Sequence, residues 1–393
     1  MPLSPAAAGT APPPAAARAV RPMLLGAALA LPGVAPTALA DTLPERQVGF
    51  RWLHYRDAQP GLDRIRVNSP SAWFVTPLGD TWSAAGSLGV DAVSGASPAW
   101  HAAISSASRI SDRRTAGDWR LTRHAARSRW TLGAVHSDER DYRSRALSFE
   151  ASVDDEAANT TWSLSTGFAN DRLEPVAGRP GAGTRRAADV LASVTRIASP
   201  VDIVQVALGA ARYTGDLSDP YKALDQRPDE RTQGFVQLRW NHHVDGGALD
   251  GSTFRTSYRY YRDDWGVRAH TASFEWVRPL PGGWSVTPLA RFHTQSAARF
   301  YYDPVYDPVL GEPFPPGFLE QPAAFRSSDT RLSAFGAATL GVRIEAALPA
   351  GWHAELRMEW YRQDAAWRVG GTGSPGLPPL DARIVQAGLR RTF

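Results

Sequence analysis

The chain has 393 residues, no cysteine and a formal net charge of +4. The lack of cysteine excludes disulfide bonds and thiolate metal sites. The positive charge is carried by arginines spread along the chain beside acids, with Lys222 the single lysine, so the sequence predicts no clustered basic face for nucleic acid. No run of about 18 apolar residues follows residue 40, which argues against a transmembrane helix.

The N-terminal stretch has the features of a secretory signal peptide. Arg18 and Arg21 precede an apolar stretch at 23–31, and the small-residue motif ALA occupies 38–40. A charged region, a short apolar core and an A-x-A site in this order are typical of a cleaved export signal. The sequence therefore predicts a signal peptide over 1–40.

Turn signals divide the rest of the chain, 41–393, into segments of similar length. Tight turns rich in Gly, Pro and Asp are expected near 77–80, 126–128, 154–156, 199–200, 245–247, 281–283 and 349–351. Longer connections are expected between them, near 58–62, 93–117, 137–142, 172–187, 213–230, 262–266, 303–329 and 364–379. Strict alternation of short and longer connections is typical of a transmembrane β-barrel.

The segments between the connections alternate with a period of two. From Leu332 to Ala346 the even positions are apolar or small, and in 352–361 apolar residues alternate with polar ones. This pattern predicts extended strands with one apolar face, although a soluble β-sandwich would alternate as well. Strands near 47–57, 63–76 and 187–197 alternate less cleanly, and Pro288 within a strand favours a bulge.

Aromatic residues recur just after the short turns, on the apolar face. An interfacial aromatic girdle requires this register, because amphipathic rings favour the headgroup level of a membrane. A sandwich has no such requirement. The predicted girdle consists of Trp82, Trp130, Trp162, Phe254, Trp284 and Trp352.

The last segment, 380–393, keeps its alternation to its final residue, Phe393. It resembles the closing strand of bacterial outer-membrane barrels, in which a terminal aromatic serves as an assembly signal for the barrel-assembly machinery. Arg391 departs from that pattern, and we expect it to reach the headgroups. The segment is predicted to pair with the first strand near 47–57.

These patterns together predict an all-β fold, a transmembrane antiparallel up-and-down β-barrel of about 16 strands over 41–393. Fourteen or eighteen strands would also fit, and an even number brings both ends of the barrel to one side. The predicted location is the cell outer membrane, with its lipid and lipopolysaccharide as surroundings.

The polar face of the predicted strands would line the barrel interior. Its charges could set the selectivity for ions or small solutes, or they could pair with one another and stiffen the wall. The candidate interior residues are Arg239, Arg255, Arg259, Glu275, Arg291, Arg343, Glu345, Glu355, Arg357 and Glu359.

Two kinds of loop are further candidates. The connection 302–329 is rich in Pro and Phe, so it could fold inward as a constriction or lie on the surface. Acidic clusters could bind a divalent cation or bridged lipopolysaccharide, but they lack the spacing of a calcium loop, and salt bridges with Arg140 and Arg143 explain them as well. These clusters are Asp138 with Glu139 and Asp141, and Asp303 with Asp307.

The sequence gives little support for an enzyme. Asp91, Ser94 and His101 could converge, and Glu139 and Asp141 could act as an acid pair. Yet the motif SGASP at 94–98 is not the G-x-S-x-G elbow, and the pair at 242–243 is not an H-E-x-x-H helix. The simpler interpretation is that Asp91 caps a strand end and the glycine at 95 turns the chain. We therefore predict no catalytic residue, metal or cofactor.

Several motifs considered together resemble those of a family of predicted bacterial outer-membrane proteins known only as a domain of unknown function. They are DAVSGASP at 91–98, ISDRR at 110–114, ERDYRS at 139–144, DPYK at 219–222 and RPDER at 227–231. The resemblance covers roughly 45–393 and implies the barrel and its location. It implies no reaction, cofactor or catalytic residue.

The most direct functional hypothesis is a porin-like channel or solute-binding barrel whose interior charges tune selectivity. The alternative is a closed barrel whose long connections at 93–117, 213–230 and 303–329 bind a partner protein, surface polysaccharide or lipid without transport. A third class, a membrane-embedded hydrolase, would need activity that is lost on mutating Asp91 or Ser94.

Overall fold

The computed structural model describes residues 43–96, 109–175, 183–220, 222, 224–304 and 324–393. The predicted signal peptide, 1–40, lies outside the described residues and stays a prediction. Among the described residues, no helix is long and apolar enough to cross a membrane.

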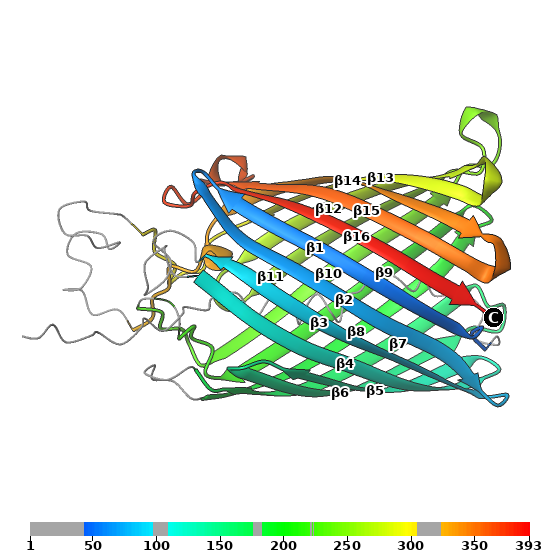
Figure 1. Cartoon of the computed structure of the whole chain (residues 1–393), viewed down its shortest axis with the longest axis horizontal. Coiled ribbons are helices and arrows are strands. Elements are labelled where there is room, and N and C mark those ends of the chain that lie inside the picture. Colours follow the sequence, from blue (N-terminus) through cyan, green and yellow to red (C-terminus); the bar gives the residue numbers. More distant parts are fainter. Residues whose placement is uncertain (1–42, 97–108, 176–182, 221, 223, 305–323) are drawn as a thin grey trace, which may run out of the picture.

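The described chain forms sixteen antiparallel strands in one closed barrel (Figure 1). This confirms the predicted fold class and strand number. The strands are β1 (Gln47–Gln59), β2 (Leu62–Leu78), β3 (Trp82–Ala96), β4 (Arg109–Ala125), β5 (Ser128–Asp138), β6 (Tyr142–Asp154), β7 (Thr160–Leu173), β8 (Gly183–Ser199), β9 (Asp202–Gly215), β10 (Glu230–His243), β11 (Thr253–Asp263), β12 (Arg268–Leu280), β13 (Trp284–Gln295), β14 (Phe335–Leu348), β15 (Trp352–Asp364) and β16 (Leu380–Thr392).

Each strand pairs with its neighbours in the chain, and β1 pairs with β16 to close the barrel. The seam extends from Gln47 opposite Thr392 to Ala58 opposite Asp381, and the Phe393 N–H donates to the Arg46 carbonyl at 2.9 Å. The predicted pairing of the last segment with the first strand is therefore confirmed. The start of β1 and the end of β16 lie at the same end of the barrel, here called the turn end; the opposite end, on the left in Figure 1, is the loop end.

The connections differ between the two ends, but they do not alternate strictly in length as expected. The turn end has tight connections such as 126–127 and 200–201, whereas the loop end has the long connections 296–334 and 365–379. The loop end also has short turns, at 60–61 and 139–141, because its strands continue further than the sequence suggested.

The β3–β4 pair illustrates how far these strands extend. Asp91 and Gly95 lie inside β3 and pair with Arg114 and Ile110 of β4. The expectation that Asp91 caps a strand end and that Gly95 turns the chain is therefore wrong. The small and polar residues of this stretch are typical of a loop. In the structure its backbone N–H and C=O groups pair with β4, so the stretch is part of the strand.

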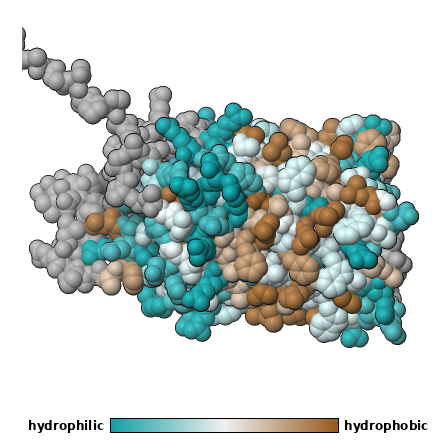
Figure 2. All heavy atoms as spheres, turned by 90° about the horizontal axis from the view of Figure 1, so that it is seen from below, coloured by the Kyte–Doolittle hydropathy of each residue, from teal (hydrophilic) through white to brown (hydrophobic). Residues whose placement is uncertain are grey.

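The barrel wall is apolar outside and polar inside, which is the reverse of a soluble core. Leu147 is 67% exposed and Leu340 62% exposed on the outer face, whereas Ser137 and Thr287 on the inner face are fully buried. Figure 2 shows the hydrophobic zone towards the turn end and a hydrophilic zone next to the loop end on one face of the barrel. Such an apolar outer zone matches a bilayer as solvent.

Two β-bulges shift the strand register. On β2 the three steps from Asp63 to Arg66 lie opposite two steps on β1, and on β8 the two steps from Ile197 to Ser199 lie opposite one step on β9. The extra residue on β2 and on β8 exchanges the inward and outward positions there. The bulge expected at Pro288 is absent: Glu275 opposite Leu289 and Arg278 opposite Val286 keep one register across β12 and β13. The proline, which has no N–H to donate, instead interrupts the pairing with β12.

The segment before β14 also differs from expectation. Leu332 was predicted to lie on a strand, but it belongs to the 3-10 turn Thr330–Leu332 and is 3% exposed. It packs with Trp265, Val267 and Ala298 in an apolar cluster that joins two connections at the loop end. This cluster packs the connection after β11 against the connection after β13.

Candidate functional site

The structure places the ten predicted interior residues on β10–β15, on the face opposite to the exposed apolar residues. Trp360 is 52% exposed on the outside of β15, whereas its neighbour Glu359 is 7% exposed. Successive residues of a strand point to opposite faces, so Glu359 points into the barrel. Residues that pair across neighbouring strands point to the same face. The registers of β10–β15 therefore show that the other nine residues also point into the barrel.

Some of these charges form an ion-pair ladder along the inner wall. Glu275 lies 3.7 Å from both Arg255 and Arg343, and Arg343 lies 3.3 Å from Glu345. Arg357 donates to Glu359 at 2.6 Å. Glu355 accepts a hydrogen bond from the Gln386 amide at 3.2 Å. These contacts agree with the expectation of a wall stiffened by Arg–carboxylate pairs.

Three of the six predicted interior arginines have no carboxylate partner among the described residues, and we call these three, Arg239, Arg259 and Arg291, the arginine patch. Arg239 donates to the Gln205 amide oxygen at 3.4 Å, and Arg291 donates to the Ser273 hydroxyl at 3.4 Å. The Arg259 guanidinium lies 3.9 Å from the centre of the Phe235 ring.

The registers bring the arginine patch together. Arg239 pairs with Ser257, which pairs with Ser273, which pairs with Arg291. Arg259 is two residues beyond Ser257 on β11 and therefore lies on the same face, one inward position closer to the loop end. The patch thus covers the inner faces of β10, β11 and β13 with uncompensated positive charge.

Loop-end residues 216–220, 222, 224–229 and 324–334 form a second charged structure that we call the loop bridge. Gln226 and Arg326 pair in an antiparallel β-bridge. Asp329 accepts hydrogen bonds from Arg227 at 2.8 Å and from Arg331 at 2.8 Å, and Arg227 also donates to Asp225 at 2.8 Å. The side chains of Asp225, Arg227 and Asp329 are 0%, 6% and 1% exposed.

Electrostatics hold the loop bridge together. Burial alone would raise the pKa of Asp329, but the charges of Arg331, Lys222 and Arg227 hold that pKa well below its ordinary value. Burial also lowers the pKa of Arg227, but Asp329 and Asp225 raise it to a net increase. Burial raises the pKa of Asp225.

The connection 365–379 crosses the mouth beside β14. Leu377 is 5% exposed and packs against Phe335, Ala337 and Tyr361, and the inner-face register of Ala337 and Tyr361 means that Leu377 lies over the barrel interior. The Gly376 N–H donates to Asp303 at 3.2 Å. This connection and the loop bridge both lie at the loop end. The segment 305–323, which includes most of the predicted constriction and Asp307, lies outside the described residues.

The six predicted girdle residues lie on the outer face near the turn end. Trp82, Trp130, Trp162 and Trp284 are 40%, 45%, 59% and 47% exposed, and Phe254 stacks on Phe274 with ring centres 5.8 Å apart. Trp352 and Phe393 lie on either side of Arg391, whose guanidinium is 5.6 Å and 4.7 Å from the two ring centres. Membrane depth and the assembly role of Phe393 stay predictions.

Several of the other candidate residues form ion pairs with arginines of the barrel wall. Asp91 lies 3.6 Å from Arg114, which also lies 3.8 Å from Glu139, and Asp138 accepts from Arg143 at 2.7 Å. His101 lies outside the described residues. No group of three His, Asp or Glu side chains that could hold a metal ion occurs in the described part of the chain.

The adjacent residues His242 and His243 form hydrogen bonds with different partners. His242 forms a hydrogen bond to Asp202 at 2.9 Å, and His243 to the Thr253 hydroxyl at 3.1 Å. Neither hydrogen bond joins the two imidazoles. Instead, one bond connects β10 to β9 and the other connects β10 to β11 at the turn end.

Sequence reasoning missed the distinction between paired and unpaired interior arginines, and it missed the loop bridge. The strand pattern identifies which arginines point inward. Which of these arginines lies next to a carboxylate depends on the strand register, which the sequence pattern does not give. The contact between Arg227 and Asp329 depends on the tertiary fold.

Comparisons with known proteins agree with this architecture. A family model described as "Protein of unknown function (DUF3570)" matches residues 105–184 and 181–381. No curated protein matches the chain. Among solved structures, a bacterial polysaccharide outer membrane secretin is 9% identical with a TM-score of 0.52, covering 90% of this chain and 100% of that chain. OpdO from Pseudomonas aeruginosa is 8% identical with a TM-score of 0.44, covering 89% and 97%. At such identities the secretin match bears on the fold alone.

Proposed function

Since the chain belongs to the DUF3570 family of proteins of unknown function, we propose a function from its barrel interior: a channel of the cell outer membrane that takes up small anionic solutes. The observation that carries the proposal is the arginine patch. Arg239, Arg259 and Arg291 project inward with only neutral partners among the described residues.

Barrel size supports passage. Small barrels of about 8 strands are filled by their own side chains, whereas barrels of about 16 strands leave room for an aqueous channel. In this setting the turn end would face the periplasm and the loop end the exterior, with lipid and lipopolysaccharide around the wall. Export by the predicted signal peptide and insertion by the barrel-assembly machinery belong to the same proposal.

The chemistry of the patch favours anions over cations. Guanidinium groups stay charged and present N–H donors in a planar fork that fits carboxylate and phosphate oxygens. Cationic side chains that line a narrow low-dielectric passage also raise the local concentration of anions. The ion-pair ladder lies on the turn-end side of the patch. Each of its arginines already faces a carboxylate, so the ladder contributes shape more than anion selectivity.

Reversal potentials in planar bilayers under a KCl gradient test the proposal. The full chain should conduct with anion preference, and the triple variant Arg239→Gln, Arg259→Gln, Arg291→Gln should lower the anion-to-cation permeability ratio by roughly tenfold. The matched control is Arg357→Gln with Glu359→Gln, which removes one cation and one anion that already pair. Equal ratios in the triple variant and the wild type would refute the anion assignment.

A second candidate is a closed barrel whose loop end binds a partner without transport. The loop bridge and the connection 365–379 favour it, because their internal contacts give the loop end a folded surface that a partner could bind. Complete absence of conductance from a correctly folded protein would select this candidate. The proposal includes no enzymatic step.

A further inference from the structure

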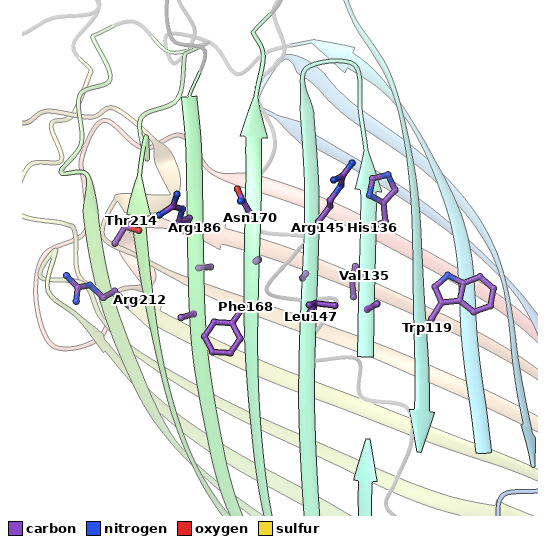
Figure 3. Close-up of a pocket in the computed structure, with 15 residues that line it drawn as sticks. Trp119, Val135, His136, Arg145, Leu147, Phe168, Asn170, Arg186, Arg212 and Thr214 are labelled. Atoms are coloured by element: carbon purple, nitrogen blue, oxygen red, sulfur yellow. The ribbon is translucent and has the colours of Figure 1, made fainter. Parts of the chain in front are cut away.

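A groove lies on the outside of the barrel wall, away from the interior. It has a volume of about 1020 Å³ and crosses β4–β9 (Figure 3). Figure 3 shows polar side chains on the side nearer the loop end and apolar side chains below them. We call it the outer groove.

The polar side of the outer groove is a single register row. His136 pairs with Arg145, Arg145 with Asn170, Asn170 with Arg186, and Arg186 with Thr214. Neighbouring strands lie about 4.8 Å apart, so Arg145 and Arg186 flank Asn170 at about 10 Å from one another along the row. Their long side chains can converge on one group in front of Asn170.

The two arginines of this row have no acidic partner within the described part of the chain. Their neighbours one row nearer the loop end differ: Arg143 pairs with Asp138 at 2.7 Å, and Arg172 pairs with Glu174 at 2.6 Å. At the far edge of the groove, Arg212 forms two bonds to Glu230 at 2.8 and 2.9 Å. The positive charges of Arg145 and Arg186 are therefore not neutralised by acidic side chains of the described residues.

The next row towards the turn end is the apolar side. Trp119 pairs with Ala134, Ala134 with Leu147, and Leu147 with Phe168. Trp119, Leu147 and Phe168 are 60%, 67% and 62% exposed. Further towards the turn end the outer face of the same strands stays apolar, with Leu132, Phe149 and Leu164 also exposed, so the outer groove lies at the border between the apolar and hydrophilic parts of the wall.

We propose that the outer groove binds a phosphorylated lipid of the surrounding leaflet. An acyl chain would lie over Leu147 and Phe168, and the phosphate would accept hydrogen bonds from Arg145 and Arg186 with the Asn170 amide between them. A lipid is the occupant that supplies both an apolar tail below the border and an anion above it, and charge complementarity excludes a neutral lipid. This site is separate from the proposed channel and does not depend on it.

Native mass spectrometry of the full, detergent-folded barrel tests the site. The probes are dioleoyl phosphatidic acid, dioleoylglycerol with the same chains but no phosphate, and inorganic phosphate. Wild type should retain phosphatidic acid, and Arg145→Gln with Arg186→Gln should weaken that binding about tenfold or more. The control, Arg143→Gln with Arg172→Gln, removes two arginines that already have acidic partners and should bind as wild type does.

Each contrary result overturns a defined part of the proposal. Equal retention of dioleoylglycerol would remove the role of the phosphate. Saturable binding of inorganic phosphate at similar strength would identify a phosphate site without a lipid. Equal binding by the two double variants would place the lipid elsewhere. Unchanged heat-dependent mobility in SDS gels establishes that each variant is folded.

Discussion

Asp329 illustrates how a single residue can anchor the loop end. Its carboxylate is 1% exposed and accepts from both Arg227 and Arg331. Removing one partner of a buried ion pair leaves the others uncompensated, which costs about 3–5 kcal/mol. The exposed pair of Arg56 and Asp63, at 45% and 61% exposure, contributes far less because water already solvates both groups.

The loop bridge should therefore weaken in acid. The pKa of Asp329 is depressed in the folded state, so its contribution is fully present above the unfolded pKa of about 3.9 and is lost as the pH falls through the folded pKa. Asp225, with a raised pKa, acts in the opposite direction and reduces the loss without reversing it. Protection factors of the backbone amides in 216–220 and 324–334, each corrected for the intrinsic exchange rate at its pH, should therefore be high at pH 7 and decrease progressively as the pH falls below about 3.9.

The variant Asp329→Asn should have lowered protection factors in these segments at pH 7 already, whereas Asp63→Asn should keep the protection factors of the wild type. Protection that is independent of pH in the wild type would contradict this role of Asp329.

At the scale of elements, the alternation of the sequence predicts the strands well because each one has an apolar outer face. It fails at three kinds of place. Bulges near Ile65 on β2 and Ala198 on β8 shift the face within a strand. Leu332 continues the apolar pattern outside β14, and Arg227 meets Asp329 through a tertiary contact. Local periodicity has no information about partners a hundred residues away.

The β9–β10 pair is an element on which the arginine patch depends. Gly209 lies opposite Phe235, and a Cβ at Gly209 would overlap the Phe235 ring. Gly209→Ala should displace that ring from beneath Arg259. Because a cation–π contact contributes about 1 kcal/mol, which corresponds to about fivefold in an equilibrium constant, we expect the anion preference in bilayers to fall by up to about fivefold.

The control for this change is Gly234→Ala on the same strand pair, where the nearest atom to a new Cβ is a backbone oxygen at 3.4 Å. It should leave the permeability ratio unchanged. Identical ratios for Gly209→Ala and wild type would show that Phe235 does not position Arg259.

At the scale of the whole molecule, closure rests on one seam between the first and last strands. Leu53 lies opposite Gln386, and Tyr55 lies opposite Ile384. The chain has no cysteine, so engineered cysteines can test this register. Leu53→Cys with Gln386→Cys should form a disulfide under mild oxidation, because directly opposed residues have Cα atoms about 4.5–5.5 Å apart.

The diagonal variant, Leu53→Cys with Ile384→Cys, should crosslink poorly because its Cα separation is about 7–8 Å. Peptide mapping by mass spectrometry distinguishes the two. Preferential crosslinking of the diagonal pair would mean that the seam is shifted by two residues.

If the bilayer border lies at the row of Trp119 and Leu147, as proposed for the outer groove, the long strands raise the rim of the barrel well clear of the bilayer. On β4, residues 109–118 precede Trp119, and ten residues at about 3.4 Å each and about 40° tilt rise roughly 26 Å. On β6, residues 142–146 precede Leu147 and rise about 13 Å by the same geometry. Both heights exceed the Debye length of about 8 Å at physiological ionic strength. An anion of the proposed channel would therefore approach the rim where headgroup charge is already screened, and the mouth would stand beyond the repulsion of the membrane's own anionic surface.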